Sequence, residues 1–218
     1  MPDRCVSLVV PVQDEDPGVV RKLVRELEVY HSPGFLRELI VVDDGSREPC
    51  PYADIRHETP LGYGAALKSG ILKAKGELIL TLDGDGHHSV WDAQRLLDFY
   101  LRFPELDMGV GDRRLQEANT TRYWGRKGLN WIASLFALRW IGDLNSGMRL
   151  FRRDVALSYL PILCDQFSFT TSITMAFLAD GRPVDWLPIK VAPRPMGASK
   201  VQVWRDGWRT LKLIVWIG

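Results

Sequence analysis

The stretch ELILTLDGDGHH, residues 77–88, joins an apolar run to a cluster of charged and polar side chains. A continuous apolar run of this length is typical of a parallel strand buried on both faces, and we expect a strand over 77–82. Two carboxylates, Asp83 and Asp85, follow directly, with glycines beside them and two histidines after them. Open parallel sheets bind their ligands at this end of the strands, so the stretch predicts both a fold class and a site.

Strand and helix patterns alternate on both sides of this stretch. Apolar runs predict strands, and apolar residues at helical spacing after the helix start Asp16-Pro17 predict the first helix. The expected strands are 6–12, 39–42, 53–57, 77–82 and 107–111, with helices beginning at residue 17 and over 62–75 and 91–103. This alternation indicates βαβ units, so we expect an α/β fold: a Rossmann-like, mostly parallel sheet with helices on both faces.

The regular alternation of strand and helix patterns ends after residue 112. A basic, polar loop (112–127) precedes an apolar helix that contains tryptophan (128–141). The expected later elements are a turn and short strand within 143–154, a helix over 167–180, a strand over 184–191 and a C-terminal amphipathic helix. Because no repeat or low-complexity linker interrupts the chain, we expect one domain over 1–197, followed by an amphipathic segment over 198–218.

Composition narrows the functional classes. A net charge of +1 over 218 residues gives no electrostatic reason to expect a nucleic-acid partner. Cys5, Cys50 and Cys164 are odd in number and form no CxxC pattern, which favours free thiols in a reducing compartment over disulfides or zinc. The N-terminus lacks the pattern of a signal peptide, and no apolar stretch reaches the roughly 18–20 residues of a spanning helix.

Polar, mostly acidic residues lie at the ends of three of the expected strands. They are Gln13-Asp14-Glu15, Asp43-Asp44, and Asp83 with Asp85. Any one of these groups is explained by a turn or a helix cap, because Asp and Gly favour turns. Three such groups at one edge of a parallel sheet favour a ligand site instead.

The spacing of Asp83, Asp85 and His87 predicts a divalent-metal site. In an extended segment these three side chains point the same way. Mg²⁺ and Mn²⁺ take carboxylate oxygens, Mn²⁺ also accepts imidazole, and substrate phosphates commonly fill the other positions. The alternative is an Asp-Gly turn with solvated histidines.

Two further groups have both a binding and a structural interpretation. Asp43 and Asp44 could accept hydrogen bonds from a nucleobase or ribose, or they could form an Asx-turn before a glycine. Gly62 and Gly64 open a helix whose N–H groups could bind phosphate. Lys68, one turn on, could assist there or face solvent.

The ordered set of motifs resembles the family-2 glycosyltransferases of the GT-A fold. The similarity is greatest to the branch that transfers a sugar to a polyprenyl phosphate, as dolichyl-phosphate mannosyltransferase does. The matching pieces are PVQDE (11–15), VVDDGS (41–46), LGYGAALKSGI (61–71), LTLDGDGHH (80–88), GDRR (111–114), DLNSGMRLFRRD (143–154), FSFTTSITMA (167–176) and PRPMGASKV (193–201). No single piece is specific, but together they cover nearly the whole chain in the family's order.

The resemblance implies a role for each matched residue. The residues implied for the nucleotide sugar are Pro11, Glu15, Asp43, Asp44, Gly62, Lys68 and Asp83. Asp83, Asp85 and Arg113 would be catalytic, and Asp83, Asp85 and His87 would hold Mn²⁺ or Mg²⁺, with His87 at a position where the family often has Gln. Arg113, Arg126, Ser199 and Lys200 would hold the acceptor phosphate. The family usually has Tyr-Asn before the Glu, whereas this chain has Gln13-Asp14, so the choice of base stays open between GDP-mannose and UDP-glucose types.

The reaction implied is an inverting transfer of a hexose to a dolichyl or undecaprenyl phosphate. A phosphate monoester with a second pKa of about 6 is largely dianionic at neutral pH, so it needs no strong general base. Basic side chains that bind the acceptor phosphate are then more important than a general base. Charge-assisted contacts to phosphate could come from Arg113, Arg122, Arg126 and Lys127. For Arg122 and Lys127, the alternative is a solvated basic loop.

A polyprenyl acceptor requires the enzyme to reach a membrane. In the C-terminal segment, Trp204, Trp208, Leu211 and Val215 share one helical face, while Arg205, Arg209 and Lys212 supply the polar side. This pattern suits an interfacial helix, although it would also serve a helix that docks on its own sheet. We therefore expect a cytoplasmic protein that is peripheral on the cytoplasmic face of a membrane. The apolar run 213–217 is compatible with a longer native chain that continues into a transmembrane segment.

Three other functions fit parts of the pattern. A glycosyltransferase with a soluble sugar or protein acceptor shares the donor site. A haloacid-dehalogenase-type phosphatase also places an Asp pair after an apolar strand, but near its N-terminus, whereas here the pair follows several βαβ elements. A non-catalytic nucleotide- or lipid-binding module would bind without turnover.

Overall fold

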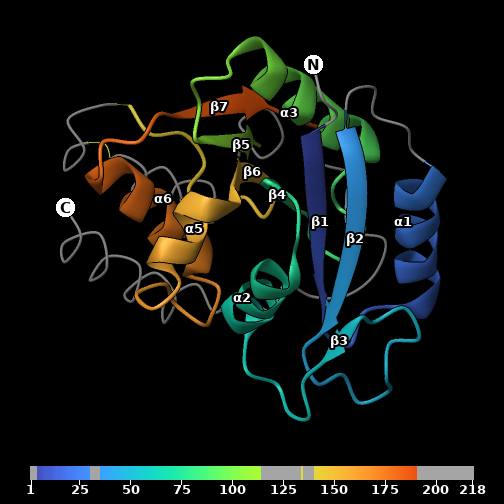
Figure 1. Ribbon diagram of the computed structural model, residues 1–218. Helices are drawn as coiled ribbons and strands as arrows, with labels where there is room; N and C mark the ends of the chain where they lie inside the picture. The colour runs from blue at the N-terminus through green and yellow to red at the C-terminus, as the bar shows by residue number, and fades with distance from the viewer. Residues whose placement is uncertain (1–3, 30–34, 114–133, 135–139, 191–218) are drawn as a thin grey trace, which may run out of the picture.

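The computed structural model describes residues 4–29, 35–113, 134 and 140–190, and its centre is one seven-stranded sheet (Figure 1). The strand order is β3-β2-β1-β4-β6-β5-β7. The strands are β1 (Arg4–Val12), β2 (Phe35–Asp43), β3 (Ile55–Arg56), β4 (Leu78–Thr81), β5 (Met108–Asp112), β6 (Arg149–Arg152) and β7 (Val184–Pro188). The helices are α1 (Pro17–Val29), α2 (Tyr63–Lys73), α3 (Val90–Arg102), α5 (Arg153–Tyr159) and α6 (Phe169–Ala179).

All neighbouring strands pair in parallel except β6, which is antiparallel to both β4 and β5. The predicted α/β class with a mostly parallel sheet is therefore confirmed. β1 lies between β2 and β4, and its register pairs Val12 with Asp43 and Val9 with Thr81. These three strands run in the same direction, so their carboxyl ends meet at one edge.

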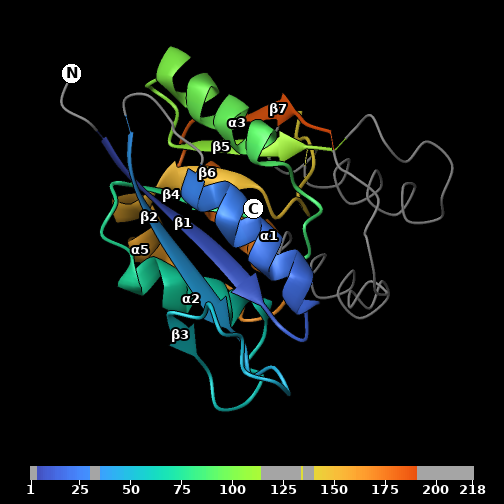
Figure 2. The same cartoon turned by 90° about the vertical axis from the view of Figure 1, so that its right-hand side faces the viewer.

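Two hydrophobic cores lie on opposite faces of the sheet. One contains apolar side chains of α1 and α3, and the other contains those of α2, α5 and α6. Figures 1 and 2 show α1 lying along β1 and β2 on one side, with α2 and α5 on the other. The strands between them are apolar on both faces because both faces are covered.

Local signals set the helix starts. Asp16 caps α1, since its Oδ1 accepts hydrogen bonds from the backbone N–H groups of Gly18 (2.8 Å) and Val19 (3.1 Å). This confirms the predicted Asp16-Pro17 start. Ser89 caps α3 in the same way, accepting from the Asp92 N–H at 3.0 Å. Ser89 directly follows the two histidines, so the turn after β4 must end at His88.

Two features of the fold differ from the expectations. The short helix α5 was not expected, because its seven residues follow β6 without an intervening turn signal. The antiparallel direction of β6 was also not expected.

The expected helix over 128–141 lies almost entirely outside the described residues, and so does the amphipathic segment 198–218. Among the helices that the structure does describe, none has both the length and the apolar character needed to cross a membrane.

Candidate active site

The acidic residues after β1, β2 and β4 do lie at one edge of the sheet, as predicted. Their three strands are adjacent and parallel in the order β2-β1-β4. Asp14 follows β1 with a positive φ of 49°, a conformation that Asp and Asn tolerate better than most residues. Its backbone N–H donates to Ser46 Oγ (2.9 Å) and its Oδ1 accepts from the Arg47 N–H (2.8 Å), so the two strand-end loops are joined.

The Asp83 carboxylate is held from both sides. Tyr63, at the start of α2, donates its hydroxyl to Asp83 Oδ1 at 2.8 Å. His88 Nε2 lies 3.3 Å from Asp83 Oδ2. Because an ionised carboxylate only accepts hydrogen bonds, that nitrogen carries the hydrogen. The Asp83 side chain nevertheless remains 24% exposed, so it is fixed but still accessible.

These contacts keep Asp83 ionised. Burial alone raises the pKa of this carboxyl, but hydrogen bonding and charge from His88, the hydroxyl of Tyr63 and the charge of Arg113 outweigh burial and lower the pKa to about 2. Gly147 closes the third side, since a Cβ atom there would lie 2.1 Å from Asp83 Oδ1. Only glycine allows the 143–147 turn to approach this closely.

The segment after Asp83 is a turn, so the expectation of an extended segment is wrong. Gly86 adopts a φ of +71°, and Asp85 Oδ1 accepts a hydrogen bond from the backbone N–H of His87 at 3.0 Å. The turn breaks the two-residue alternation on which the common direction of the three side chains depended. The turn brings His88 to Asp83.

The predicted three-ligand metal set is not preassembled. Within residues 4–29, 35–113, 134 and 140–190, no group of three or more His, Cys, Asp or Glu side chains is arranged to hold a metal ion. The donor chemistry still fits a hard cation. Two carboxylates, Asp83 and Asp85, lie at the strand end, and Mg²⁺ or Mn²⁺ sites commonly use one or two carboxylates with phosphate oxygens completing the shell.

The Asp43 carboxylate is buried and engaged by its own loop. It accepts from the backbone N–H of Ser46 (2.8 Å), the backbone N–H of Cys50 (3.0 Å) and the guanidinium of Arg56. Burial raises the pKa of Asp43, but the hydrogen bonds from Cys50, Ser46 and Arg56 outweigh it, so the net shift is downward. The carboxylate therefore shapes the loop over residues 44–50.

The Asp44 carboxylate anchors the start of α2. It accepts from the backbone N–H groups of Leu61 (2.9 Å) and Gly62 (2.8 Å). His57 bridges Asp44 Oδ1 (2.7 Å) and Ser69 Oγ (2.9 Å). The Gly62 N–H, which was expected to face phosphate, is thus donated to Asp44.

Lys68 also has partners within the chain. Its ammonium donates to the Leu163 carbonyl (2.5 Å) and to Asp165 Oδ1 (2.6 Å). These bonds attach α2 to the segment before α6. The predicted role of Lys68 at the diphosphate remains a prediction.

A cation and an acidic residue meet at the end of β5. Arg113 donates from Nε to Asp143 Oδ2 (2.6 Å) and from Nη2 to Asp143 Oδ1 (3.1 Å), and its side chain is 19% exposed. Behind them, fully buried Arg149 donates to the carbonyls of Leu144 (2.6 Å) and Ser146 (2.9 Å). Together these bonds fix the turn that contacts Asp83.

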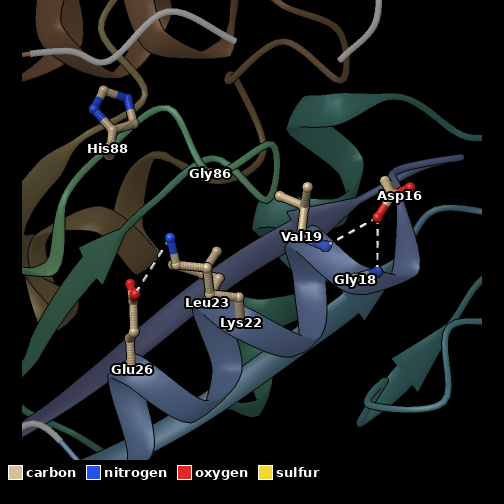
Figure 3. Close-up of a pocket in the computed structure, with 8 residues that line it drawn as sticks. All are labelled: Asp16, Gly18, Val19, Lys22, Leu23, Glu26, Gly86 and His88. Carbon is tan, nitrogen blue, oxygen red and sulfur yellow. Dashed lines mark hydrogen bonds and ion pairs between the residues drawn. The ribbon is translucent and has the colours of Figure 1, made fainter. Parts of the chain in front are cut away.

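Two pockets flank the strand ends. One, of about 580 Å³, lies over the ends of β1 and β2, and its lining includes Glu15, Arg47 and Tyr52. The other, of about 340 Å³, lies between α1 and the turn that carries Gly86 and His88 (Figure 3). Pro11 lines neither pocket. It is buried inside β1, and its carbonyl oxygen would be 2.7 Å from a Cβ atom at Gly84.

Five residues of this arrangement were not predicted: Tyr63, His88, Asp143, Gly147 and Arg149. Each lies inside a quoted motif, but the first two motifs were interpreted through their glycines and acidic pair, and the 143–154 motif only as a turn and a short strand. The contacts of a buried arginine and a partly buried tyrosine can be found only once the elements around them are placed. Arg126, Ser199 and Lys200, expected at the acceptor phosphate, lie outside the described residues.

Comparison with known proteins identifies a matching family model and named relatives. The model described as Glycosyl transferase family 2 matches residues 7–160. A dolichyl-phosphate beta-glucosyltransferase of Trichomonas vaginalis is 28% identical over 185 residues, covering 70% of this chain and 55% of the relative. An undecaprenyl-phosphate 4-deoxy-4-formamido-L-arabinose transferase of Pseudomonas paraeruginosa is 24% identical, covering 75% and 54%. The chain therefore spans about half the length of these two relatives.

A solved structure supports the fold independently. Glucosyl-3-phosphoglycerate synthase from Mycobacterium tuberculosis, crystallised with Mn²⁺, uridine diphosphate and phosphoglyceric acid, superposes with a TM-score of 0.75. The alignment covers 98% of this chain and 78% of that chain at 15% sequence identity. At this identity the similarity establishes the GT-A type of fold and nothing finer.

Proposed function

The chain belongs to glycosyl transferase family 2, and we propose that it transfers a hexose from a nucleotide sugar to a polyprenyl phosphate. The observation that carries the proposal is the Asp83 carboxylate, ionised and fixed at the carboxyl end of β4 beside Asp85. The names of the dolichyl- and undecaprenyl-phosphate relatives support the class of acceptor.

We place the donor over the carboxyl ends of β1, β2 and β4. The larger pocket, with Glu15 in its lining, has room for a nucleoside, and Asp43 and Asp44 shape the loops around it. A uridine diphosphate sugar is the donor we favour, because the superposed synthase was crystallised with uridine diphosphate. GDP-mannose is the alternative donor.

Asp83 and Asp85 would hold the divalent cation, and Mn²⁺ is the ion present in the superposed synthase. Such a cation supplies electrostatic stabilisation of the charge that develops on the leaving diphosphate. The chain's own contribution is to keep Asp83 ionised and oriented, through Tyr63 and His88. His87 stays a candidate third ligand that would have to turn toward the site.

The acceptor phosphate would approach from the side of Arg113. This guanidinium is oriented by Asp143 and lies close enough to Asp83 to lower its pKa. Arg126, Ser199 and Lys200 would complete the acceptor site. We further propose that the segment 198–218 lies at the cytoplasmic surface of a membrane, where a polyprenyl phosphate is available.

A second candidate is transfer to a small phosphate-bearing acceptor in solution. It is favoured by the superposed synthase, whose crystal contains phosphoglyceric acid. Both candidates use the same strand ends. A polyprenyl phosphate offers a phosphate oxygen as the nucleophile, whereas 3-phosphoglycerate also carries a hydroxyl, which would need a general base.

The test is a screen of UDP-hexoses and GDP-mannose with Mn²⁺, using a short polyprenyl phosphate and 3-phosphoglycerate as alternative acceptors. A sugar-linked lipid phosphate, detected by mass spectrometry, would support the main proposal. Product only with 3-phosphoglycerate would replace it with the second candidate. Binding of the nucleotide sugar without any transfer would favour a non-catalytic module and overturn both.

A further inference from the structure

Tyr63 places an aromatic hydroxyl against one of the strand-end carboxylates. It occupies the first position of α2, and its hydroxyl lies 2.8 Å from Asp83 Oδ1. The contact joins residues 20 positions apart, so it depends on how α2 packs against the sheet, where its main neighbours are β1 and β2.

The Tyr63 ring, like its hydroxyl, has a contact partner within the chain. It stacks on Phe167, with the ring centroids 5.4 Å apart and the planes at 18°. Phe167 belongs to the segment that precedes α6, which also receives the Lys68 bonds. The position of this segment therefore sets the position of the ring, and the ring sets the hydroxyl.

The two flanking glycines explain why this arrangement is tight. A Cβ atom at Gly62 would lie 2.4 Å from the Asp165 carbonyl oxygen, and one at Gly64 would lie 2.2 Å from the Cys164 carbonyl oxygen. The start of α2 is thus pressed directly against the backbone of residues 164–165, and the Ala65 N–H donates to the Asp165 carbonyl at 3.0 Å. The Gly-Tyr-Gly motif here serves close packing and presents the phenol to Asp83.

We propose that Tyr63 is a positioning residue, whose phenol holds the Asp83 carboxylate in the orientation that binds a divalent cation with a nucleoside diphosphate. The inference rests on the proposed function, because it assumes that Asp83 meets that cation. Tyr63 acts through Asp83 and touches neither the sugar nor the acceptor. Hydrogen-bond partners of metal ligands typically contribute about 10–100-fold to metal affinity or activity.

The test is Tyr63→Phe, which removes only the hydroxyl. The measurement is Mn²⁺ affinity in the presence of uridine diphosphate, followed by the electron paramagnetic resonance signal of free Mn²⁺. We expect the affinity to fall by about 10–100-fold relative to the unaltered protein. Tyr159→Phe is the matched control, since it removes a hydroxyl that donates to Asp180 Oδ2 at 2.7 Å, on the exposed side of α5. The control should bind Mn²⁺ as the unaltered protein does.

Thermal unfolding separates positioning from a general packing role. The melting temperature of Tyr63→Phe should change no more than that of Tyr159→Phe. If Tyr63→Phe does not fold, Phe167→Leu keeps the hydroxyl, removes the stacked ring and should lower Mn²⁺ affinity by about 2–10-fold. Unchanged Mn²⁺ affinity in the folded variant would overturn the positioning role alone. Absence of Mn²⁺ and nucleotide binding by the unaltered protein would overturn the proposed function and this inference with it.

Discussion

Arg113 and Asp143 form two parallel hydrogen bonds, 2.6 and 3.1 Å long, between the end of β5 and the turn before β6. The pair is largely buried, and the same turn places Gly147 against Asp83. A fork-shaped donor on a carboxylate fixes orientation as well as charge. Arg113 is therefore held in one orientation next to the carboxylate pair, where an acceptor phosphate would meet it.

Replacing Arg113 by Lys should keep the positive charge but lose the pair of hydrogen bonds to Asp143. We expect kcat/KM for the acceptor to fall by about 10–100-fold, because charge-assisted hydrogen bonds contribute about 1.5–3 kcal/mol each. Steady-state kinetics at varied acceptor concentrations measures this kcat/KM. Arg152→Lys is the control, since Arg152 forms a similar but exposed pair with Asp154 at 3.2 Å and lies beside Leu78, at the opposite end of β4 from Asp83. Equal activity of Arg113→Lys and the control would exclude Arg113 from the acceptor site.

Asp85→Asn should abolish Mn²⁺-dependent transfer while the protein remains folded. The change keeps the shape of the side chain but removes the charge that a cation requires, so we expect turnover to fall by about 100-fold or more. Asp83→Asn should behave similarly. Asp98→Asn alters an exposed acid on α3 that accepts from Gln94, and it should leave turnover unchanged. Turnover should also stop on chelation and return with added Mn²⁺. Full activity of either site variant would remove the carboxylate pair from the mechanism.

The sequence could predict the sheet because its strands are apolar on both faces, as β1 and β4 show. It could also predict that Asp14, Asp43 and Asp83 share an edge, because adjacent parallel strands end together. It could not predict the direction of β6, whose buried Arg149 reads as a surface residue until its acceptors are in place.

The contact between His88 and Asp83 could not be predicted for a local reason. The positive φ of Gly86 turns the chain and brings His88 to the carboxylate, while the role of His87 as a metal ligand stays a prediction. Tyr63 could not be found either, because its contact with Asp83 depends on the packing of an entire helix.

Asp43 should make stability depend on pH at the acid end. Its pKa is lower in the folded protein than its ordinary value near 3.8, so it stabilises the fold above that value and this contribution is lost as the pH falls through the folded-state pKa. Asp43→Asn should therefore lower the free energy of unfolding by about 2–4 kcal/mol at pH 7, since it breaks a buried, charge-assisted network. The difference from the unaltered protein should narrow below about pH 4. Urea unfolding at pH 7 and pH 3 measures both values. A difference that is the same at the two pH values would contradict the role of the ionised carboxylate.

Gly147→Ala tests whether the turn before β6 sets the position of Asp83. A Cβ atom 2.1 Å from Asp83 Oδ1 cannot be accommodated, so either the carboxylate or the turn must move. The turn resists movement, because Thr81 donates to the Gly147 carbonyl at 2.7 Å and Arg149 holds the carbonyls on either side of Asn145. We therefore expect Asp83 to be displaced, with a loss of Mn²⁺ affinity and of turnover of at least about 10-fold.

Gly181→Ala provides a control for Gly147→Ala that separates strain from site geometry. Gly181 has open space around its Cβ position but a φ of +69°, so alanine there should cost roughly 1 kcal/mol of stability through backbone strain. It lies after α6, away from the strand ends, and should leave Mn²⁺ binding and turnover unchanged. If Gly147→Ala lost stability to a similar extent but bound Mn²⁺ normally, the turn would be a packing element that does not orient Asp83. Loss of Mn²⁺ binding in Gly147→Ala alone would show that the 143–147 turn is part of the site.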